Sequence, residues 1–170
     1  MKITHCEVWP VTLTLEEPIT IAYATTEKTV NYFIRIETDS GLNGFGCSAF
    51  DQEVTGENEH TIGRALQDIA VPLLIGEDPL EYRSILHKLR GLLIHEPTAM
   101  ASVDMALHDI LGKKAGLPLY RLFGSGRSSM LTSITIGIQP VPSVIEKARM
   151  WIGKGYRALK IKGGISLEDD

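Results

Sequence analysis

The chain has 170 residues, and its 44% hydrophobic and 22% charged content is typical of a folded globular protein, which excludes disordered and collagen-like chains. Its 17 basic and 21 acidic residues give a formal net charge of −4, so no basic surplus indicates a nucleic-acid groove. Apolar runs reach only a few residues, far short of the ~20 that a membrane span needs, so we expect neither a nucleic acid nor a membrane as a partner.

The first third of the chain has the period-two alternation of β-strands. Extended segments are expected over residues 4–9, 30–37 and 44–50. In the first of these, Thr4, Cys6 and Val8 share one face. A turn sequence that ends at Gly41 separates the last two segments. The pattern predicts an antiparallel three-stranded meander with one covered face.

The chain contains two cysteines, Cys6 and Cys47. Two cysteines are too few for a disulfide scaffold, and their spacing does not fit a metal site. The N-terminal residues show no signal-peptide pattern. We therefore expect a cytoplasmic protein in which both thiols stay reduced.

Residues 16–27 lie between the first two predicted strands. This stretch contains Pro18 and few strong apolar anchors, so it is predicted to be a loop of about a dozen residues, which is long for a hairpin connection. Loops of this length often carry function, and we expect a flap here.

Three segments in the next third of the chain place apolar residues at helical spacing. The three sets are Ile62, Ala65, Leu66, Ile69 and Leu73; Tyr82, Ile85, Leu86, Leu89 and Leu93; and Ala99, Val103, Ala106, Leu107, Ile110 and Leu111. Pro97 opens the third helix and Gly116 ends it. Alanines keep this helix slim, so we expect it to lie close to a neighbouring element.

Beyond residue 126 the pattern becomes strand, helix, strand. The segments are residues 131–138, 142–154 and 157–162, which together predict a βαβ unit with parallel strands and a right-handed crossover. The inward residues of the helix are expected to be Val144, Ala148, Trp151 and Ile152.

The last residues have the sequence of a helix start. Ser166 is expected to be an N-cap, and Asp169 follows at capping-box spacing. Because no helix follows in the sequence, we expect that this polypeptide is cut inside a second domain.

The strand at 157–162 contains two lysines with one residue between them. In a strand, Lys160 and Lys162 point to the same side, roughly 6–7 Å apart. Two ammonium groups in a confined site repel each other and lose hydration, and both effects favour the neutral amine that a general base requires. The alternative is an edge strand that shows two lysines to water and so discourages aggregation.

The order of these elements resembles the enolase superfamily, in particular its mandelate racemase and muconate-lactonizing branch. The stretches that carry the resemblance are the meander with its flap, Ala-Ser-Val-Asp-Met-Ala-Leu-His-Asp-Ile-Leu-Gly-Lys-Lys-Ala-Gly-Leu-Pro-Leu over residues 101–119, Leu-Phe-Gly over 122–124, and Lys-Ile-Lys over 160–162. The flap together with the two barrel strands is most similar to dipeptide epimerases.

The resemblance implies an α+β capping domain, an antiparallel three-stranded meander plus helices, over residues 1–127. The first βαβ of a truncated TIM-like (β/α) barrel would follow over residues 128–170. A complete barrel needs about 250 residues and eight strands, so we expect no turnover from this chain alone.

The family implies Mg²⁺-dependent removal of a proton α to a carboxylate, which gives an enediolate. Lys162 matches the family's base on one face of the substrate, and Lys160 matches the partner that holds the substrate carboxylate. The family's metal ligands lie on later barrel strands, so this chain is expected to supply no metal ligand.

The family's flap, and the loop corresponding to residues 50–56, choose the substrate, which is expected to be a small molecule, either a dipeptide or another carboxylate. The candidate substrate-binding residues are Thr135, Tyr23, Ile19 and Thr25. Between Glu17 and Glu27 there is no Lys or Arg, which disfavours an acidic substrate residue. Tyr23 and Ile19 favour an apolar or aromatic N-terminal residue instead. We also expect a homo-oligomer.

Other functions remain open at this point. An o-succinylbenzoate synthase or a muconate cycloisomerase would share the scaffold and the lysines. A non-catalytic capping module that binds a partner is a third possibility. The adjacent His108 and Asp109 do not suggest a catalytic dyad, because neighbouring side chains on a helix point about 100° apart.

Overall fold

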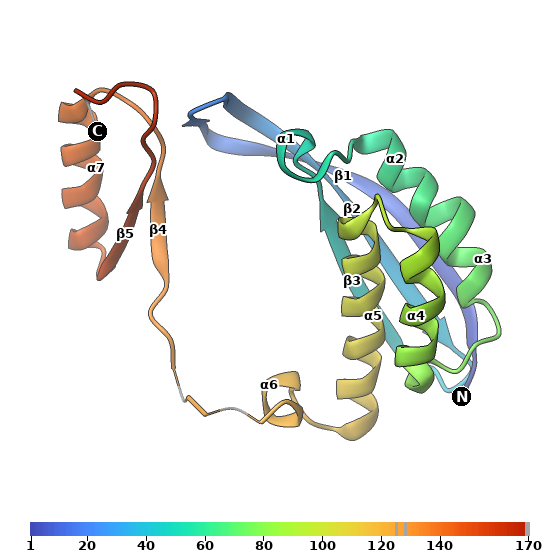
Figure 1. The fold of residues 1–170 in the computed structure, drawn as a ribbon. Coiled ribbons are helices and arrows are strands. Elements are labelled where there is room, and N and C mark those ends of the chain that lie inside the picture. Colours follow the sequence, from blue (N-terminus) through green and yellow to red (C-terminus); the bar gives the residue numbers. More distant parts are fainter. Residues whose placement is uncertain (125, 128, 169–170) are drawn as a thin grey trace. The chain divides into compact units, whose positions relative to one another are not determined.

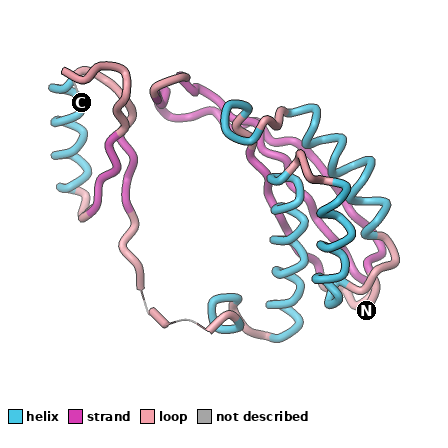
Figure 2. Tube along the Cα trace, in the orientation of Figure 1, coloured by secondary structure: helices cyan, strands magenta, loops and turns pink. Residues whose placement is uncertain are grey.

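The computed structural model of the chain describes residues 1–124, 126–127 and 129–168. Figures 1 and 2 show the arrangement of its elements within each part of the chain. The strands are β1 (Ile3–Ile21), β2 (Ala24–Thr38), β3 (Asn43–Ala49), β4 (Ser133–Ile136) and β5 (Ala158–Ile161). The α-helices are α1 (Gln52–Thr55), α2 (Glu59–Arg64), α3 (Val71–Leu74), α4 (Tyr82–Leu92), α5 (Pro97–Ala115), α6 (Leu119–Leu122) and α7 (Val141–Gly153). A π-helical turn, η1 (Ala65–Ala70), and a 3₁₀ turn, η2 (Pro79–Glu81), complete the set.

The chain forms two compact units. The first unit comprises residues 1–13 and 30–125, and the second comprises residues 14–29 and 126–170. The tip of the β1–β2 hairpin therefore groups with the C-terminal segment. The first unit is built on the sheet β1-β2-β3, and β4 and β5 form a separate two-stranded sheet in the second.

Helices cover one face of the three-stranded sheet (Figure 1). As predicted, alternate residues of β2 face this core from Tyr32 onward, with Tyr32, Ile34 and Ile36 buried. In β1 the prediction is partly wrong, because Thr4 is exposed and Ile3 is the buried residue at the start of the strand. The Thr4 hydroxyl donates instead to a backbone carbonyl of the neighbouring strand, which a polar side chain can do and an apolar one cannot.

The first predicted helix is divided by the π-helical turn η1. Of its expected inward residues, Ile69 and Leu73 are only partly buried, and Ala70 and Leu74 are fully buried in their place. The wider turn adds one residue, so the side chains that follow it are rotated. Pro72 explains the wider turn, since proline lacks an N–H and its ring clashes with the carbonyl four residues earlier in an α-helix.

Helix α5 packs closely on β3, as its small residues predicted. A Cβ atom placed on Gly44 would overlap the carbonyl oxygen of Ala106, and one on Gly46 would overlap that of Ser102. The two glycines therefore allow backbone to approach backbone. The helix ends at Gly116, whose φ of 66° lies in the left-handed region that glycine favours.

The expected loop over residues 16–27 is instead the end of a long hairpin. β1 and β2 continue to within two residues of each other, and only Ala22 and Tyr23 form the turn. The prediction is wrong because Pro18 does not interrupt the strand. The stretch is rich in threonine and isoleucine, which favour strands, and a proline is tolerated in an edge strand such as β1.

In the second unit, β4 and β5 pair in parallel, and α7 connects them in the sequence. This confirms the predicted βαβ unit. Ile152 is 58% exposed and not inward as expected, because a two-stranded sheet is too narrow to cover all apolar residues of a helix. The Ser166 hydroxyl accepts a bond from the Glu168 amide at 3.3 Å, and Asp169 lies outside the described residues. Among the helices described, none is long and apolar enough to cross a membrane.

Candidate functional site

The parallel pair β4–β5 places three of the predicted site residues, Thr135, Lys160 and Lys162, on one face. Thr135 is the register partner of Lys160, and Ser133 is the partner of Ala158. Because side chains alternate along a strand, these residues share a face, which Lys162 joins one step further on. The four aliphatic residues Ile134, Ile136, Leu159 and Ile161 occupy the opposite face. The predicted arrangement of the two lysines therefore agrees with the register.

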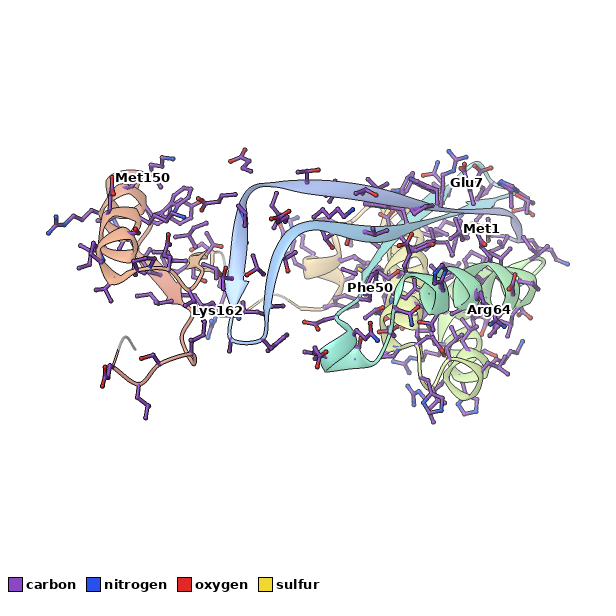
Figure 3. The ribbon with its side chains drawn as sticks, turned by 90° about the horizontal axis from the view of Figure 1, so that it is seen from above. Met1, Glu7, Phe50, Arg64, Met150 and Lys162 are labelled. Carbon is purple, nitrogen blue, oxygen red and sulfur yellow. The ribbon has the colours of Figure 1, made fainter. Side chains whose placement is uncertain are left out.

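Lys162 lies where β5 ends. Its backbone N–H donates to the carbonyl of Ile136 at 3.0 Å, so the parallel ladder extends to this residue. The Lys162 side chain is half-buried and that of Lys160 is exposed. The register brings Gly137 beside Lys162, because the partners before them are Ile136 and Ile161. Figure 3 shows Lys162 near the tip of the β1–β2 hairpin.

The hairpin tip touches the carboxyl ends of both strands. The N–H of Ile138 donates to the carbonyl of Thr20 at 2.8 Å. A Cβ atom on Gly137 would lie 3.0 Å from that oxygen and 3.1 Å from the Thr20 nitrogen. One on Gly164 would lie 3.5 Å from the Cβ of Ala22. The tip is thus seated on the two glycine-containing segments that follow β4 and β5.

An ion pair gives the hairpin a second attachment. Nζ of Lys147, on α7, lies 2.7 Å from the Glu17 carboxylate. Within the tip, the hydroxyls of Thr20 and Thr25 are 3.0 Å apart and form a hydrogen bond across the hairpin. Thr25, predicted to bind substrate, therefore contributes to the structure of the tip.

The structure groups several of the predicted site residues within the second unit. Ile19 is 37% exposed, and its Cγ2 lies 3.5 Å from the Cβ position of residue 137, on the Lys162 side of the sheet. Tyr23, at the turn of the hairpin, is 56% exposed. The loop at residues 50–56, predicted to help choose the substrate, belongs to the first unit, where the Asp51 carboxylate caps α1.

Sequence reasoning missed the residues that seat the tip, namely Gly137, Thr20 and Lys147. A signal was present for Gly137, because a glycine between two isoleucines at the end of a strand often marks a close approach of another backbone. No comparable signal identifies Lys147. Its partner is 130 residues away in the sequence.

The described residues hold no candidate metal centre, since no three His, Cys, Asp or Glu side chains converge in that part of the chain. The donor set that Mg²⁺ prefers, a group of oxygen ligands, does not form among them. His108 and Asp109 are directed apart, as expected. Nδ1 of His108 lies 2.8 Å from Asp104, and Asp109 accepts bonds from the Phe45 amide and from Lys113.

Comparison with known proteins places the chain in a family. Residues 3–124 match the mandelate racemase/muconate lactonizing enzyme N-terminal domain. The L-Lys-D/L-Arg epimerase of Desulforapulum autotrophicum is 40% identical over 170 residues, which are 100% of this chain and 48% of that protein. The chain thus spans about half the length of the curated relatives it matches.

Two solved structures are similar over the whole of the chain. The dipeptide epimerase of Methylococcus capsulatus, complexed with Mg and the dipeptide L-Arg-D-Lys, superposes with a TM-score of 0.95 at 35% identity. The dipeptide epimerase of Enterococcus faecalis, complexed with Mg and the dipeptide L-Leu-L-Tyr, superposes with a TM-score of 0.95 at 32% identity. Each comparison covers 100% of this chain and 48% of the other. The chain belongs to the mandelate racemase/muconate lactonizing enzyme family of the enolase superfamily, and its relatives include epimerases and racemases.

Proposed function

We propose that the protein containing this chain epimerises a dipeptide by removing and returning the proton on a carbon α to a carboxylate. The observation that carries this proposal is the shared face of Thr135, Lys160 and Lys162 at the carboxyl ends of β4 and β5. In (β/α) barrels, this end of the strands carries the active site. Membership of a family that contains epimerases supports the reaction type.

Each lysine has a distinct part in the proposed reaction. The neutral amine of Lys162 accepts the α-proton, the C–H bonding pair moves into the substrate, and an enediolate forms while Lys162 becomes an ammonium. A second acid–base group on the opposite side of the carbon donates a proton there, which completes the epimerisation. The Lys160 ammonium binds the substrate carboxylate, which a charge-assisted hydrogen bond favours.

Mg²⁺ is the proposed cofactor, because related dipeptide epimerases have been crystallised with it. The described residues of this chain provide no ligand set for it. For the same reason we propose that the 170-residue chain is inactive by itself. The metal ligands and the second base would belong to a part of the barrel that this sequence does not include.

The proposed substrate is a dipeptide with an apolar or aromatic N-terminal residue. The exposed Ile19 and Tyr23 at the hairpin tip support this choice. The named relatives act on different side chains: one is an L-Lys-D/L-Arg epimerase and another is a hydrophobic dipeptide epimerase. A substrate panel must therefore include cationic, apolar and acidic dipeptides.

The test is proton exchange in D₂O, followed by NMR, with a longer protein that contains residues 1–170. Exchange at the α-carbon of both epimers of a dipeptide is the expected result. Lys162→Met should abolish exchange for one epimer and leave the other measurable. Lys154→Met, an exposed lysine at the opposite end of the βαβ unit, should change neither rate.

Two other outcomes would overturn the proposal. Loss of water from a hydroxylated cyclohexadiene carboxylate, or ring closure of a muconate, without dipeptide exchange would favour a synthase or cycloisomerase. No exchange with any carboxylate, with Mg²⁺ added, would favour a non-catalytic capping module.

A further inference from the structure

The hairpin tip is held by two attachments of different chemistry. One is the backbone contact between Thr20 and the segment of Gly137 and Ile138, and the other is the ion pair between Glu17 and Lys147. Both attachments lie within the second unit, and they come from different elements, the end of β4 and the middle of α7. Together they fix both the position and the direction of the tip.

The first attachment depends on the missing side chain of Gly137. Its φ is not in the left-handed region, so the backbone conformation itself would accept another residue. A Cβ atom would nevertheless lie 3.0–3.1 Å from Thr20 O and N, which is too close for a β-branched side chain. Glycine is therefore required here by the approach of the hairpin and not by a turn.

The second attachment is a partly covered ion pair. The Lys147 side chain is 28% exposed and that of Glu17 is 59% exposed. Exposed pairs of this kind contribute little to overall stability. Its effect is therefore expected on the local opening of the hairpin tip, which is a smaller equilibrium than global unfolding.

We propose that Gly137 and Lys147 are positioning residues, which hold the hairpin tip over the carboxyl ends of β4 and β5 beside Lys162. Their contribution is to place Ile19 next to Gly137, on the side of the sheet where the two lysines lie. The docking of the tip stands on the contacts alone. Its consequence for substrate choice rests on the proposed function.

Hydrogen–deuterium exchange of the 170-residue chain, read by NMR, tests the docking without any activity. Gly137→Val should raise the exchange rate of the Ile138 amide by about tenfold, because overpacking displaces Thr20. Lys147→Gln should raise it by about two- to fivefold in low salt. The matched controls are Gly153→Ala, whose Cβ would meet open space, and Arg149→Gln on the exposed side of the same helix.

Rescue separates a specific attachment from a general loss of stability. Lys147→Arg and the charge exchange Glu17→Lys with Lys147→Glu should restore the slow exchange of Ile138. Exchange of the core amides of β2 should not change in any variant. Unaltered Ile138 exchange in both Gly137→Val and Lys147→Gln, or equal acceleration by the two controls, would overturn the docking.

The consequence for substrate choice is measured in the longer protein. Release of the tip by Lys147→Gln should raise KM by more than it lowers kcat, and Lys147→Arg should restore KM. If the wild type is active and Lys147→Gln has the same KM and kcat, the role of the tip in substrate choice is overturned. If the wild type shows no epimerisation at all, while Ile138 exchange responds as stated, the proposed function fails and the docking remains.

Discussion

The carboxylate of Glu57 and the backbone amide of Thr98 are joined by a hydrogen bond of 2.9 Å, although 41 residues separate them in the sequence. The same oxygen, Oε1, also accepts a bond of 2.8 Å from the Thr98 hydroxyl. Glu57 is 1% exposed, and Glu96, the N-cap residue of α5, makes no capping bond with its side chain. Glu57 therefore caps α5 from a distant loop, and its charge faces the positive end of the helix dipole.

Glu57→Ala is expected to destabilise the chain by about 2–3 kcal/mol, because buried donors at the start of α5 lose their acceptor. Glu57→Gln should cost less, since its amide oxygen can still accept. Urea unfolding monitored by circular dichroism measures both. Glu53→Ala, an exposed acidic residue four positions earlier, serves as the control. Equal midpoints for Glu57→Ala and the control would exclude the long-range cap.

Gly46→Ala should be among the most damaging single substitutions in the first unit. The added methyl group would overlap the carbonyl of Ser102, so β3 and α5 must separate. We expect a loss of about 3 kcal/mol or more in the free energy of unfolding. Gly91→Ala, in α4 with open space around it, should instead stabilise by about 0.5–1 kcal/mol. Thermal unfolding of the two variants would contradict the backbone contact if both midpoints moved in the same direction.

The sequence was sufficient for much of the fold because local patterns carry periodicity. The alternation around Ile34 and the helical spacing around Leu107 both match the buried faces found. Features that depend on distant residues were not predictable. Nothing near Glu57 indicates that it would cap a helix 41 residues later. The hairpin was missed because Pro18 is locally unfavourable in a strand, while the edge position that permits it is a property of the whole sheet.

The candidate site was also predictable only where a local pattern determines it. One intervening residue between Lys160 and Lys162 is enough to place both on one side of a strand, and the register with Thr135 agrees with this. The seat of the hairpin tip was not predictable, because the bond between Thr20 and Ile138 joins segments more than one hundred residues apart. The roles of Thr135, Lys160 and Lys162 in catalysis and substrate binding stay predictions.

The Cys6 thiol should be unreactive in the folded chain. Burial, with a smaller contribution from the Glu37 charge, raises the pKa of Cys6 from 9.0 to about 12. At about pH 8 the reactive thiolate is therefore about a thousandfold scarcer than in the unfolded chain. Iodoacetamide labelling followed by mass spectrometry should modify Cys47 before Cys6. Burial also raises the pKa of Cys47, but no nearby carboxylate in the described part of the chain adds to that shift. Equal labelling rates would contradict this.

The same shift gives a pH dependence of stability. Because the folded state favours the protonated Cys6 thiol, its contribution is complete below pH 9.0 and is lost as the pH rises towards about 12. Unfolding free energies should therefore fall over this interval, and the fall should be smaller in Cys6→Ala. A profile that is identical in both proteins would show that other groups cause the alkaline loss.

Lys160 provides a test of the division of labour between the two lysines, in the longer protein that contains this chain. If Lys160 binds the substrate carboxylate, Lys160→Met removes a charged hydrogen bond and should raise KM by about 10- to 100-fold. Lys160→Arg should recover part of the loss, because a guanidinium also pairs with a carboxylate. The Lys162 amine remains, so α-proton exchange should persist at saturating substrate. A Lys160→Met enzyme with unchanged KM but no exchange would instead assign the proton transfer to Lys160, and Lys162 would then be left without its proposed role.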